Sequence, residues 1–265
     1  MRTRFRPDLA SVRWDLRRFG MSVHRLRPAP GSPKVFSNSI PKAGTHLTER
    51  ALCLHPALYR KLTPTMTRGL QRTRPERVDR LIATARPGQV LVAHLPHSAE
   101  LADTLHEHGV AIVVTVRDPV EIAASWMHFV RAWKSHPLHA RATSMTDDEL
   151  LGLRLEGDET VGIAPFRQVF RDYAGWLGSA DHVVRFDRLR SPATRADALT
   201  ALWGALDVAH DDRRVARVAD DLVSSASPTY RPGARDPALA GVSAQVLDRL
   251  HQDLAWAFET FGYAR

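Results

Sequence analysis

The residues best suited to chemistry lie in the turn at positions 41–45, which has the sequence Pro-Lys-Ala-Gly-Thr. An apolar pair precedes this turn at positions 35–36, and a helix is predicted after it over 45–54. In a strand–turn–helix arrangement, the unpaired N–H groups and the positive end of the helix dipole converge on one point. Lys42 adds a full positive charge there. The turn therefore predicts a binding site for a phosphate or another anion.

The order of residues in this turn differs from that of the nucleoside-triphosphatase loop, G-x-x-x-x-G-K-[ST]. Here Lys42 precedes Gly44, and the loop is shorter. A phosphotransferase that uses nucleoside triphosphates also needs a Mg²⁺-holding acid after a strand, and the sequence has neither feature in place. Such a phosphotransferase is the alternative enzyme class, and Mg²⁺-dependent ATP binding would test it.

Three other polar residues come after apolar runs. His94 directly follows the run 90–93, Arg117 follows the longer run 110–116, and Ser125 lies eight residues after Arg117. A His, with its ordinary pKa near 6.5, suits a general base, and an Arg offers a planar fork of donors to a phosphate. Each residue alone also has an ordinary interpretation, as a structural His, a surface Arg and a small core-facing Ser.

The elements that would position these residues are strands alternating with helices. Apolar runs predict strands at 35–36, 90–93, 110–116 and 183–186, and helical patterns occur at 45–54, 76–85, 99–108, 120–133, 165–177, 193–206 and 242–261. This alternation predicts an α/β fold with an open, mostly parallel sheet flanked by helices on both faces. Ligands of such sheets bind beyond the carboxyl ends of the strands. We therefore expect Lys42, His94 and Arg117 to meet at that edge.

The helix after the third strand has a clear predicted start. Asp118 stands at the N-cap, Pro119 at the first helical position and Glu121 at the third, which is the pattern of a capping box. This start places Arg117 at the end of the strand and Ser125 on the second turn of the helix.

Together, these motifs resemble those of the sulfotransferases that use 3′-phosphoadenosine 5′-phosphosulfate (PAPS). The family has Pro-Lys-[Ser/Thr/Ala]-Gly-Thr after a strand, as at 41–45, and Arg-[Asn/Asp]-Pro followed by a Ser eight residues after the Arg, as at 117–125. Many members carry His-Leu-Pro between the two, as at 94–96. Phe186-Asp187 and the segment Tyr-Arg-Pro-Gly at 230–233 match later family marks. The resemblance runs from about residue 35 to the C-terminus.

The resemblance implies the P-loop-like sulfotransferase fold and a set of site residues. His94 and Lys42 would be catalytic, as the general base and as the cation at the leaving phosphate. The residues that would bind the donor are Lys42, Ala43, Gly44, Thr45, His46, Leu47, Arg117, Ser125, Phe186, Arg231 and Gly233. Leu47 stands near the position where many small-molecule sulfotransferases have a Trp that stacks on adenine.

The implied reaction is direct, in-line transfer of a sulfuryl group from PAPS to a hydroxyl of a small molecule, lipid or glycoside. His-Leu-Pro favours the branch of soluble, small-molecule enzymes. No metal is expected, and the His residues at 128, 136 and 139 have no Cys or carboxylate companions at ligand spacing.

Length and composition indicate one globular domain over 30–265, with a substrate lid at 131–162 that includes a short helix at 147–155. The chain has 265 residues, of which 44% are hydrophobic and 25% charged. Its single Cys excludes an intrachain disulfide, and no apolar run approaches the length of a membrane span. The expectation is a cytoplasmic monomer or homodimer.

Most of the net charge of +8 belongs to a basic leader at 1–29, which has eight Arg and two Asp. Apolar residues recur at helical spacing within it, so one interpretation is a helix that docks on the domain. The other is a non-enzymatic surface that binds an anionic polymer or membrane. Because most of the excess charge belongs to the leader, nucleic acid is not an expected partner.

Overall fold

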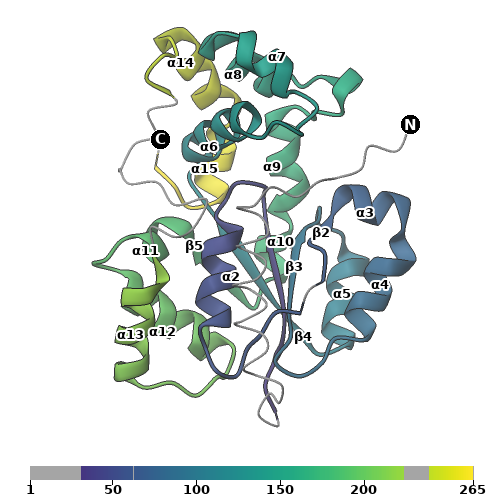
Figure 1. Ribbon diagram of the computed structural model, residues 1–265, viewed down its shortest axis with the longest axis vertical. Helices are drawn as coiled ribbons and strands as arrows, with labels where there is room; N and C mark the ends of the chain where they lie inside the picture. The colour runs from purple at the N-terminus through teal and green to yellow at the C-terminus, as the bar shows by residue number, and fades with distance from the viewer. Residues whose placement is uncertain (1–30, 62, 224–238, 265) are drawn as a thin grey trace.

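A computed structural model describes residues 31–61, 63–223 and 239–264, and it contains a five-stranded parallel sheet. The strand order is β2-β3-β1-β4-β5, with β1 at the centre (Figure 1). The strands are β1 Lys34–Ser39, β2 Met66–Thr67, β3 Val90–His94, β4 Val110–Val116 and β5 His182–Arg185. The predicted α/β fold with a parallel sheet is confirmed. The short strand β2 was not predicted, because two residues leave no readable pattern.

Helices lie on both faces of this sheet (Figure 1). They are α2 Thr45–Cys53, α3 Arg68–Thr73, α4 Pro75–Ala83, α5 Ala99–Glu107, α6 Pro119–Ala132, α7 His139–Ser144, α8 Asp147–Glu156, α9 Phe166–Ala174, α10 Trp176–Ser179, α11 Phe186–Arg190, α12 Arg195–Ala205, α13 Asp212–Leu222, α14 Ala244–Asp253 and α15 Ala255–Thr260, with a 3₁₀ turn at Glu159–Val161.

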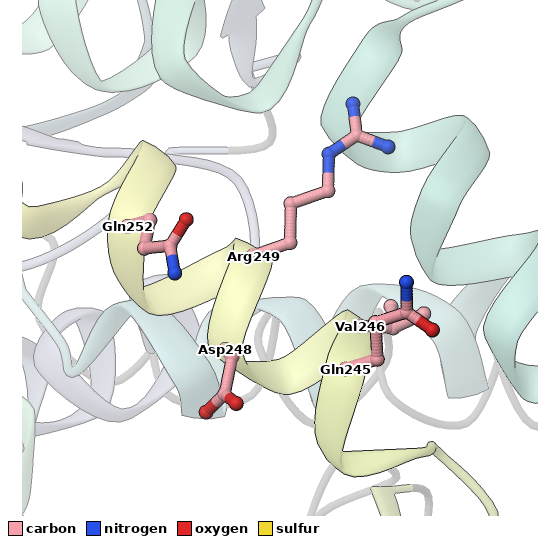
Figure 2. Close-up of a pocket in the computed structure, with 5 residues that line it drawn as sticks. All are labelled: Gln245, Val246, Asp248, Arg249 and Gln252. Carbon is pink, nitrogen blue, oxygen red and sulfur yellow. The ribbon is translucent and has the colours of Figure 1, made fainter.

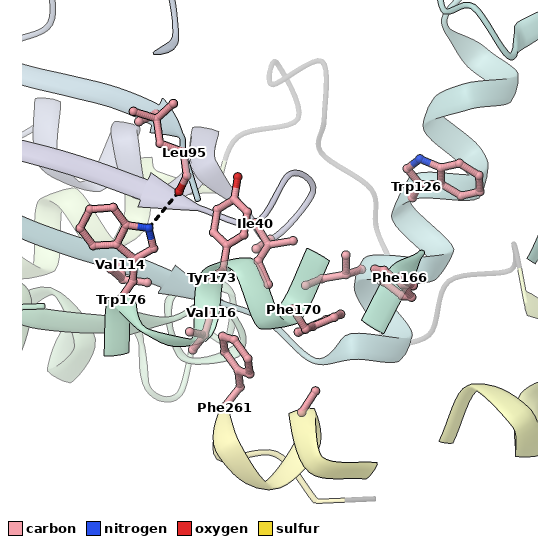
Figure 3. Packing of buried hydrophobic residues seen from close by; sticks show 14 of the residues in the cluster. Ile40, Leu95, Val114, Val116, Trp126, Phe166, Phe170, Tyr173, Trp176 and Phe261 are labelled. Atoms are coloured by element: carbon pink, nitrogen blue, oxygen red, sulfur yellow. Dashed lines mark hydrogen bonds between the residues drawn. The ribbon is translucent and has the colours of Figure 1, made fainter. Parts of the chain in front are cut away.

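The core has two parts, one on each face of the sheet. Neighbouring residues of β1 show this division, because Val35 and Phe36 are both fully buried but belong to different hydrophobic clusters. The cluster that contains Phe36 includes side chains of α5, α6, α8, α9 and α15, whereas the cluster that contains Val35 includes side chains of α2, α12 and α13. Figure 3 shows part of the first cluster, including Trp176 and Phe170. A central strand buried on both faces explains the continuous apolar runs in the sequence.

The predicted helix at 165–177 is divided into α9 and α10 around Gly175. The Asp172 carbonyl, which would serve residue 176 in a continuous helix, accepts a hydrogen bond from the N–H of His97 at 2.6 Å. A Cβ on Gly175 would also lie 2.3 Å from the His97 ring. The loop after β3 therefore takes the carbonyl that the next helical hydrogen bond would use, and the helix is interrupted at Gly175 before α10 begins.

Two further differences between the predicted and the observed elements affect the C-terminal helix and the fourth strand. The helix at 242–261 is two helices, α14 and α15, and the fourth predicted strand ends at Arg185 rather than Phe186. Phe186 begins α11 and turns its ring toward Gly44 and Arg117. These tertiary contacts, which no local pattern reports, end the strand one residue early.

The segment 131–162 contains α7, α8 and the 3₁₀ turn. The predicted short helix there is confirmed as α8, which begins with a capping box between Thr146 and Glu149 and buries Leu150 and Leu151 in the core. Its role as a substrate lid stays a prediction, and the basic leader lies outside the described residues. No helix in the described ranges combines the length and the apolar composition of a membrane-spanning segment.

Candidate active site

The predicted anion-binding turn links β1 to α2. Lys42 and Gly44 both have left-handed backbone conformations, with φ of 79° and 108°, and the Ala43 N–H donates to the Ile40 carbonyl at 3.0 Å. The N-cap of α2 is Gly44, which has no side chain to satisfy the first N–H groups of the helix. The loop thus presents backbone donors, the helix dipole and the Lys42 charge at one place.

Gly44 also permits the close approach of Phe186 from α11. A Cβ at position 44 would lie 2.2 Å from Cδ2 of the Phe186 ring. On the same ring lies the Arg117 guanidinium, with its carbon 4.3 Å from the ring centre. An Nη of Arg117 donates to the Lys42 carbonyl at 3.0 Å. The structure therefore brings three predicted site residues, Gly44, Arg117 and Phe186, into direct or near contact.

Asp118 caps α6 as predicted, accepting hydrogen bonds from the N–H groups of Val120 and Glu121 at 2.7 and 3.2 Å. The reciprocal half of the predicted capping box is not formed. The Glu121 carboxylate instead accepts a hydrogen bond from Nε of Arg117 at 2.8 Å, because the guanidinium offers a charged partner in the same place. This pair fixes the Arg117 side chain at the end of β4.

Ser125 lies on the face of α6 that looks toward the turn. Glu121, Ser125 and Phe129 are spaced four residues apart, so they share one side of the helix. The first contacts Arg117, and the ring of the last lies 4.1 Å from Nζ of Lys42. Ser125 is therefore between two groups that touch the site. Sequence reasoning missed Phe129, although the same four-residue spacing from Ser125 would have indicated it.

His94 is the last residue of β3, the strand beside β1. Its Nδ1 is 2.8 Å from the Ser39 carbonyl oxygen. A carbonyl can only accept, so Nδ1 carries the hydrogen and Nε2 has the lone pair that a general base requires. The Ser39 hydroxyl also lies 2.6 Å from the Thr45 hydroxyl. Ser39 thus connects the candidate base to the first residue of α2.

The residue after His94 is fixed by Asn38, which the sequence analysis did not select. The buried Asn38 amide donates to the Leu95 carbonyl at 2.9 Å and accepts from the Leu95 N–H at 3.0 Å. The indole N–H of Trp176 donates to the same carbonyl at 2.9 Å (Figure 3). These bonds hold the end of β3 and with it His94. The local sequence did not indicate this role, because Asn38 stands between two Ser residues at the polar end of β1.

The surroundings of His94 favour its neutral form. Burial is the largest cause that lowers the pKa of His94 to about 4, and the positive charges of His46 and Lys42 act in the same direction. The hydrogen bond with Ser39 opposes them. His94 is therefore neutral, and competent as a base, at every pH well above 4.

We predict that the His94 imidazole titrates near pH 4 in an NMR titration, and that this signal is absent from His94→Asn. Because the folded pKa lies below the usual value of about 6.5, the unfolded chain binds more protons between these pH values. The His94 contribution to the free energy of unfolding should therefore fall as the pH drops from about 6.5 toward 4. A midpoint near 6.5 in the folded protein would contradict this environment.

The other predicted donor-site residues are placed less centrally. His46 is exposed on the first turn of α2, with Nδ1 3.7 Å from the Glu49 carboxylate. Leu47 is half-buried and packs against the Val35 cluster. Arg231 and Gly233 lie outside the described residues. Within the described ranges, no group of three or more His, Cys, Asp or Glu side chains is arranged to hold a metal ion.

A separate hollow lies along α14, lined by Gln245, Val246, Asp248, Arg249 and Gln252 (Figure 2). All five come from a single helix, and Arg249 pairs with Glu156 of α8 at 2.9 Å. None of them belongs to the group around Lys42, His94 and Arg117.

The segments at 41–45, 94–96 and 117–125 all lie within the match to a single family model. The family model described as "Sulfotransferase domain" matches residues 32–182. Among solved structures, mouse sulfotransferase SULT7A1 complexed with PAP is 17% identical, with a TM-score of 0.62 over 88% of this chain and 89% of that one. A retinol dehydratase in complex with androsterone and the inactive cofactor PAP is 14% identical, with a TM-score of 0.57 over 87% and 82% of the two chains. No curated protein sequence gives a significant match.

Proposed function

Because this chain belongs to the sulfotransferase domain family, we propose that it moves a sulfuryl group from PAPS to a hydroxyl group. The observation that carries the proposal is the meeting of an anion-binding turn, a phosphate-suited Arg and a neutral His at one edge of the sheet. Three of the solved structures with this fold contain 3′-phosphoadenosine 5′-phosphate (PAP), the product that PAPS would leave.

The described residues offer separate places for the two phosphate groups of such a donor. The turn at 42–45 and the start of α2 would hold the 5′-phosphate through backbone N–H groups. Arg117 and the Ser125 hydroxyl would hold the 3′-phosphate, with Phe186 beside them. The contact between Arg117 and the Lys42 carbonyl links the two places, so one donor molecule can engage both.

His94 and Lys42 would divide the chemistry between the acceptor and the leaving group. PAPS supplies the sulfuryl group when it is bound. Nε2 of His94 takes the hydroxyl proton of the acceptor, whose oxygen then bonds to sulfur. Lys42 and the N–H groups of the turn neutralise the negative charge that grows on the departing phosphate oxygen. The products are a sulfate ester and PAP.

The acceptor is proposed to be a small molecule, lipid or glycoside with a free hydroxyl. Phe129 stands next to Lys42, and its ring centre is 4.8 Å from that of Trp133, which is 47% exposed. These rings lead from the transfer site to the segment 131–162, which is our proposed lid on the acceptor side. Solved retinol dehydratase structures with this fold contain androsterone and retinol.

The proposal is tested by calorimetric titration of the full chain with PAP and, separately, with Mg²⁺ and ATP. We expect saturable PAP binding and none with Mg²⁺–ATP, followed by transfer of labelled sulfate from PAPS in a screen of hydroxyl acceptors. Binding of Mg²⁺–ATP in preference to PAP would indicate a phosphotransferase instead.

Arg117→Ala should weaken PAP binding by roughly a hundredfold, because a charge-assisted, bidentate contact to a phosphate is lost. The preference for PAP over adenosine 5′-phosphate, which lacks the 3′-phosphate, should fall by a similar factor. Titrations of wild type and variant with both nucleotides measure the two effects. A matched control is Arg249→Ala. Arg249 lies on α14 and pairs with Glu156 of α8, outside the group around Lys42, His94 and Arg117. Unchanged nucleotide preference in Arg117→Ala would remove Arg117 from the 3′-phosphate site.

A further inference from the structure

The contact between Arg117 and Phe186 begins where the sheet stops. Val116 of β4 and Arg185 of β5 are partners in the last rung of that strand pair. Arg117 directly follows β4 and Phe186 directly follows β5, and the Arg117 guanidinium stacks on the Phe186 ring. The hydrogen bonds between β4 and β5 hold the backbone only as far as Val116 and Arg185. The geometry of the Arg117–Phe186 contact therefore depends on what holds these two strand ends.

Tyr263, near the C-terminus, contacts both strand ends. Its hydroxyl is 2.8 Å from the Asp187 carboxylate and 3.2 Å from the Val116 carbonyl oxygen. Both are acceptors, so the single O–H hydrogen is directed mainly to the carboxylate and is shared with the carbonyl. One acceptor directly precedes Arg117 and the other directly follows Phe186. The hydroxyl therefore spans the two strand ends.

The Tyr263 ring is fixed as firmly as its hydroxyl. The Arg185 guanidinium lies over the ring, 4.2 Å from its centre, and also donates to the Gly262 carbonyl. The Tyr263 N–H donates to the Phe258 carbonyl at 2.7 Å, just past the end of α15. Burial, together with the neighbouring Asp187, raises the pKa of Tyr263, so the hydroxyl keeps its hydrogen and remains a donor.

Tyr263 contacts the neighbours of Arg117 and Phe186 rather than those two residues themselves. Its hydroxyl lies against Asp187 and the Val116 carbonyl, and its ring lies against the Arg185 guanidinium. We therefore expect the effect of Tyr263 on nucleotide binding to be transmitted through Arg117 and Phe186.

We propose that Tyr263 is a positioning residue for the 3′-phosphate side of the donor site, and that its hydroxyl holds Arg117 and Phe186 in register. This inference rests on the proposed function. It assigns a binding role to the C-terminal tail, which none of the sequence motifs covers, and it predicts that donor affinity and rate respond separately to this residue.

The test is Tyr263→Phe, which keeps the ring and its contact with Arg185 and removes only the hydroxyl. We expect the KM for PAPS and the Kd for PAP to rise roughly tenfold, which corresponds to about 1.4 kcal/mol. The Kd for adenosine 5′-phosphate should rise less, so the preference for PAP falls. kcat should stay within about twofold, because His94 and Lys42 are held by β3 and the turn after β1.

Tyr59→Phe is the matched control. Tyr59 is partly buried, and its backbone forms an isolated β-bridge with Gln89, which directly precedes β3. Tyr59 therefore lies at the amino ends of the strands, away from the site at their carboxyl ends. It should leave both nucleotide affinities unchanged. In an Asp187→Ala background, removal of the Tyr263 hydroxyl should have little further effect on PAP binding, because the shared hydrogen bond is already lost.

Two outcomes would overturn the inference: unchanged nucleotide preference in Tyr263→Phe, or additive effects of Tyr263→Phe and Asp187→Ala. If Tyr263→Phe lowers the melting temperature but leaves the nucleotide preference unchanged, the role of Tyr263 is merely structural and the inference is also overturned. If wild type binds no PAP, the proposed function fails instead, and wild-type titration separates the two cases.

Discussion

His94→Ala is expected to lower the rate of sulfuryl transfer roughly a thousandfold, within the range that loss of a general base produces. PAP binding should stay within about twofold of wild type, because His94 contacts Ser39 rather than the groups proposed to hold the phosphates. Single-turnover assays with labelled PAPS and titrations with PAP measure the two quantities.

His94→Asn separates the role of the base from the role of the contact. An Asn side chain can still donate to the Ser39 carbonyl, where Nδ1 of His94 now lies at 2.8 Å, but it has no basic nitrogen. If His94 is the base, Asn should be as inactive as Ala. If the His94 contact only orders the turn, Asn should restore most of the activity, and the assignment of His94 as the base would then be wrong.

The fold was predictable to a large extent because its central strands are buried on both faces. The runs that became β3 and β4 are continuous and apolar, and the parallel arrangement followed from the alternation with helices. Gly175 and Phe186 show the limit. Gly175 interrupts a helix where the His97 N–H takes the Asp172 carbonyl, and Phe186 leaves a strand to meet Gly44 and Arg117. Both depend on contacts between residues distant in sequence.

The sequence predicted the reacting groups of the candidate site but not the residues that hold them in position. His94 ends a strand, and Lys42 and Arg117 come after strands, so the topology of the sheet brings all three to one edge. Asn38 acts through the backbone of Leu95, and Tyr263 acts through strand ends more than 70 residues away in sequence. Neither residue type in its local sequence indicates such a partner, so only the packed structure identifies them.

Lys42→Met should lower kcat by roughly two to three orders of magnitude, because the charge that neutralises the departing phosphate oxygen is lost. Met keeps an unbranched apolar stem, so packing on the Phe129 ring is retained, where Nζ now lies 4.1 Å from the ring centre. The left-handed backbone at this position, with φ of 79°, imposes similar strain on either side chain. The change therefore tests the charge rather than the fold.

The loss of kcat in Lys42→Met, compared with the loss of PAP affinity, decides the role of Lys42. A cation that serves mainly the leaving group should affect kcat far more than PAP affinity, which the backbone N–H groups of the turn and Arg117 largely maintain. Lys42→Arg is the matched variant, because it keeps the charge with a different geometry. It should recover part of kcat. Equal losses of kcat and PAP affinity would instead make Lys42 a simple anchor for the 5′-phosphate, and the stabilisation of the leaving group would then rest on the turn and the dipole of α2.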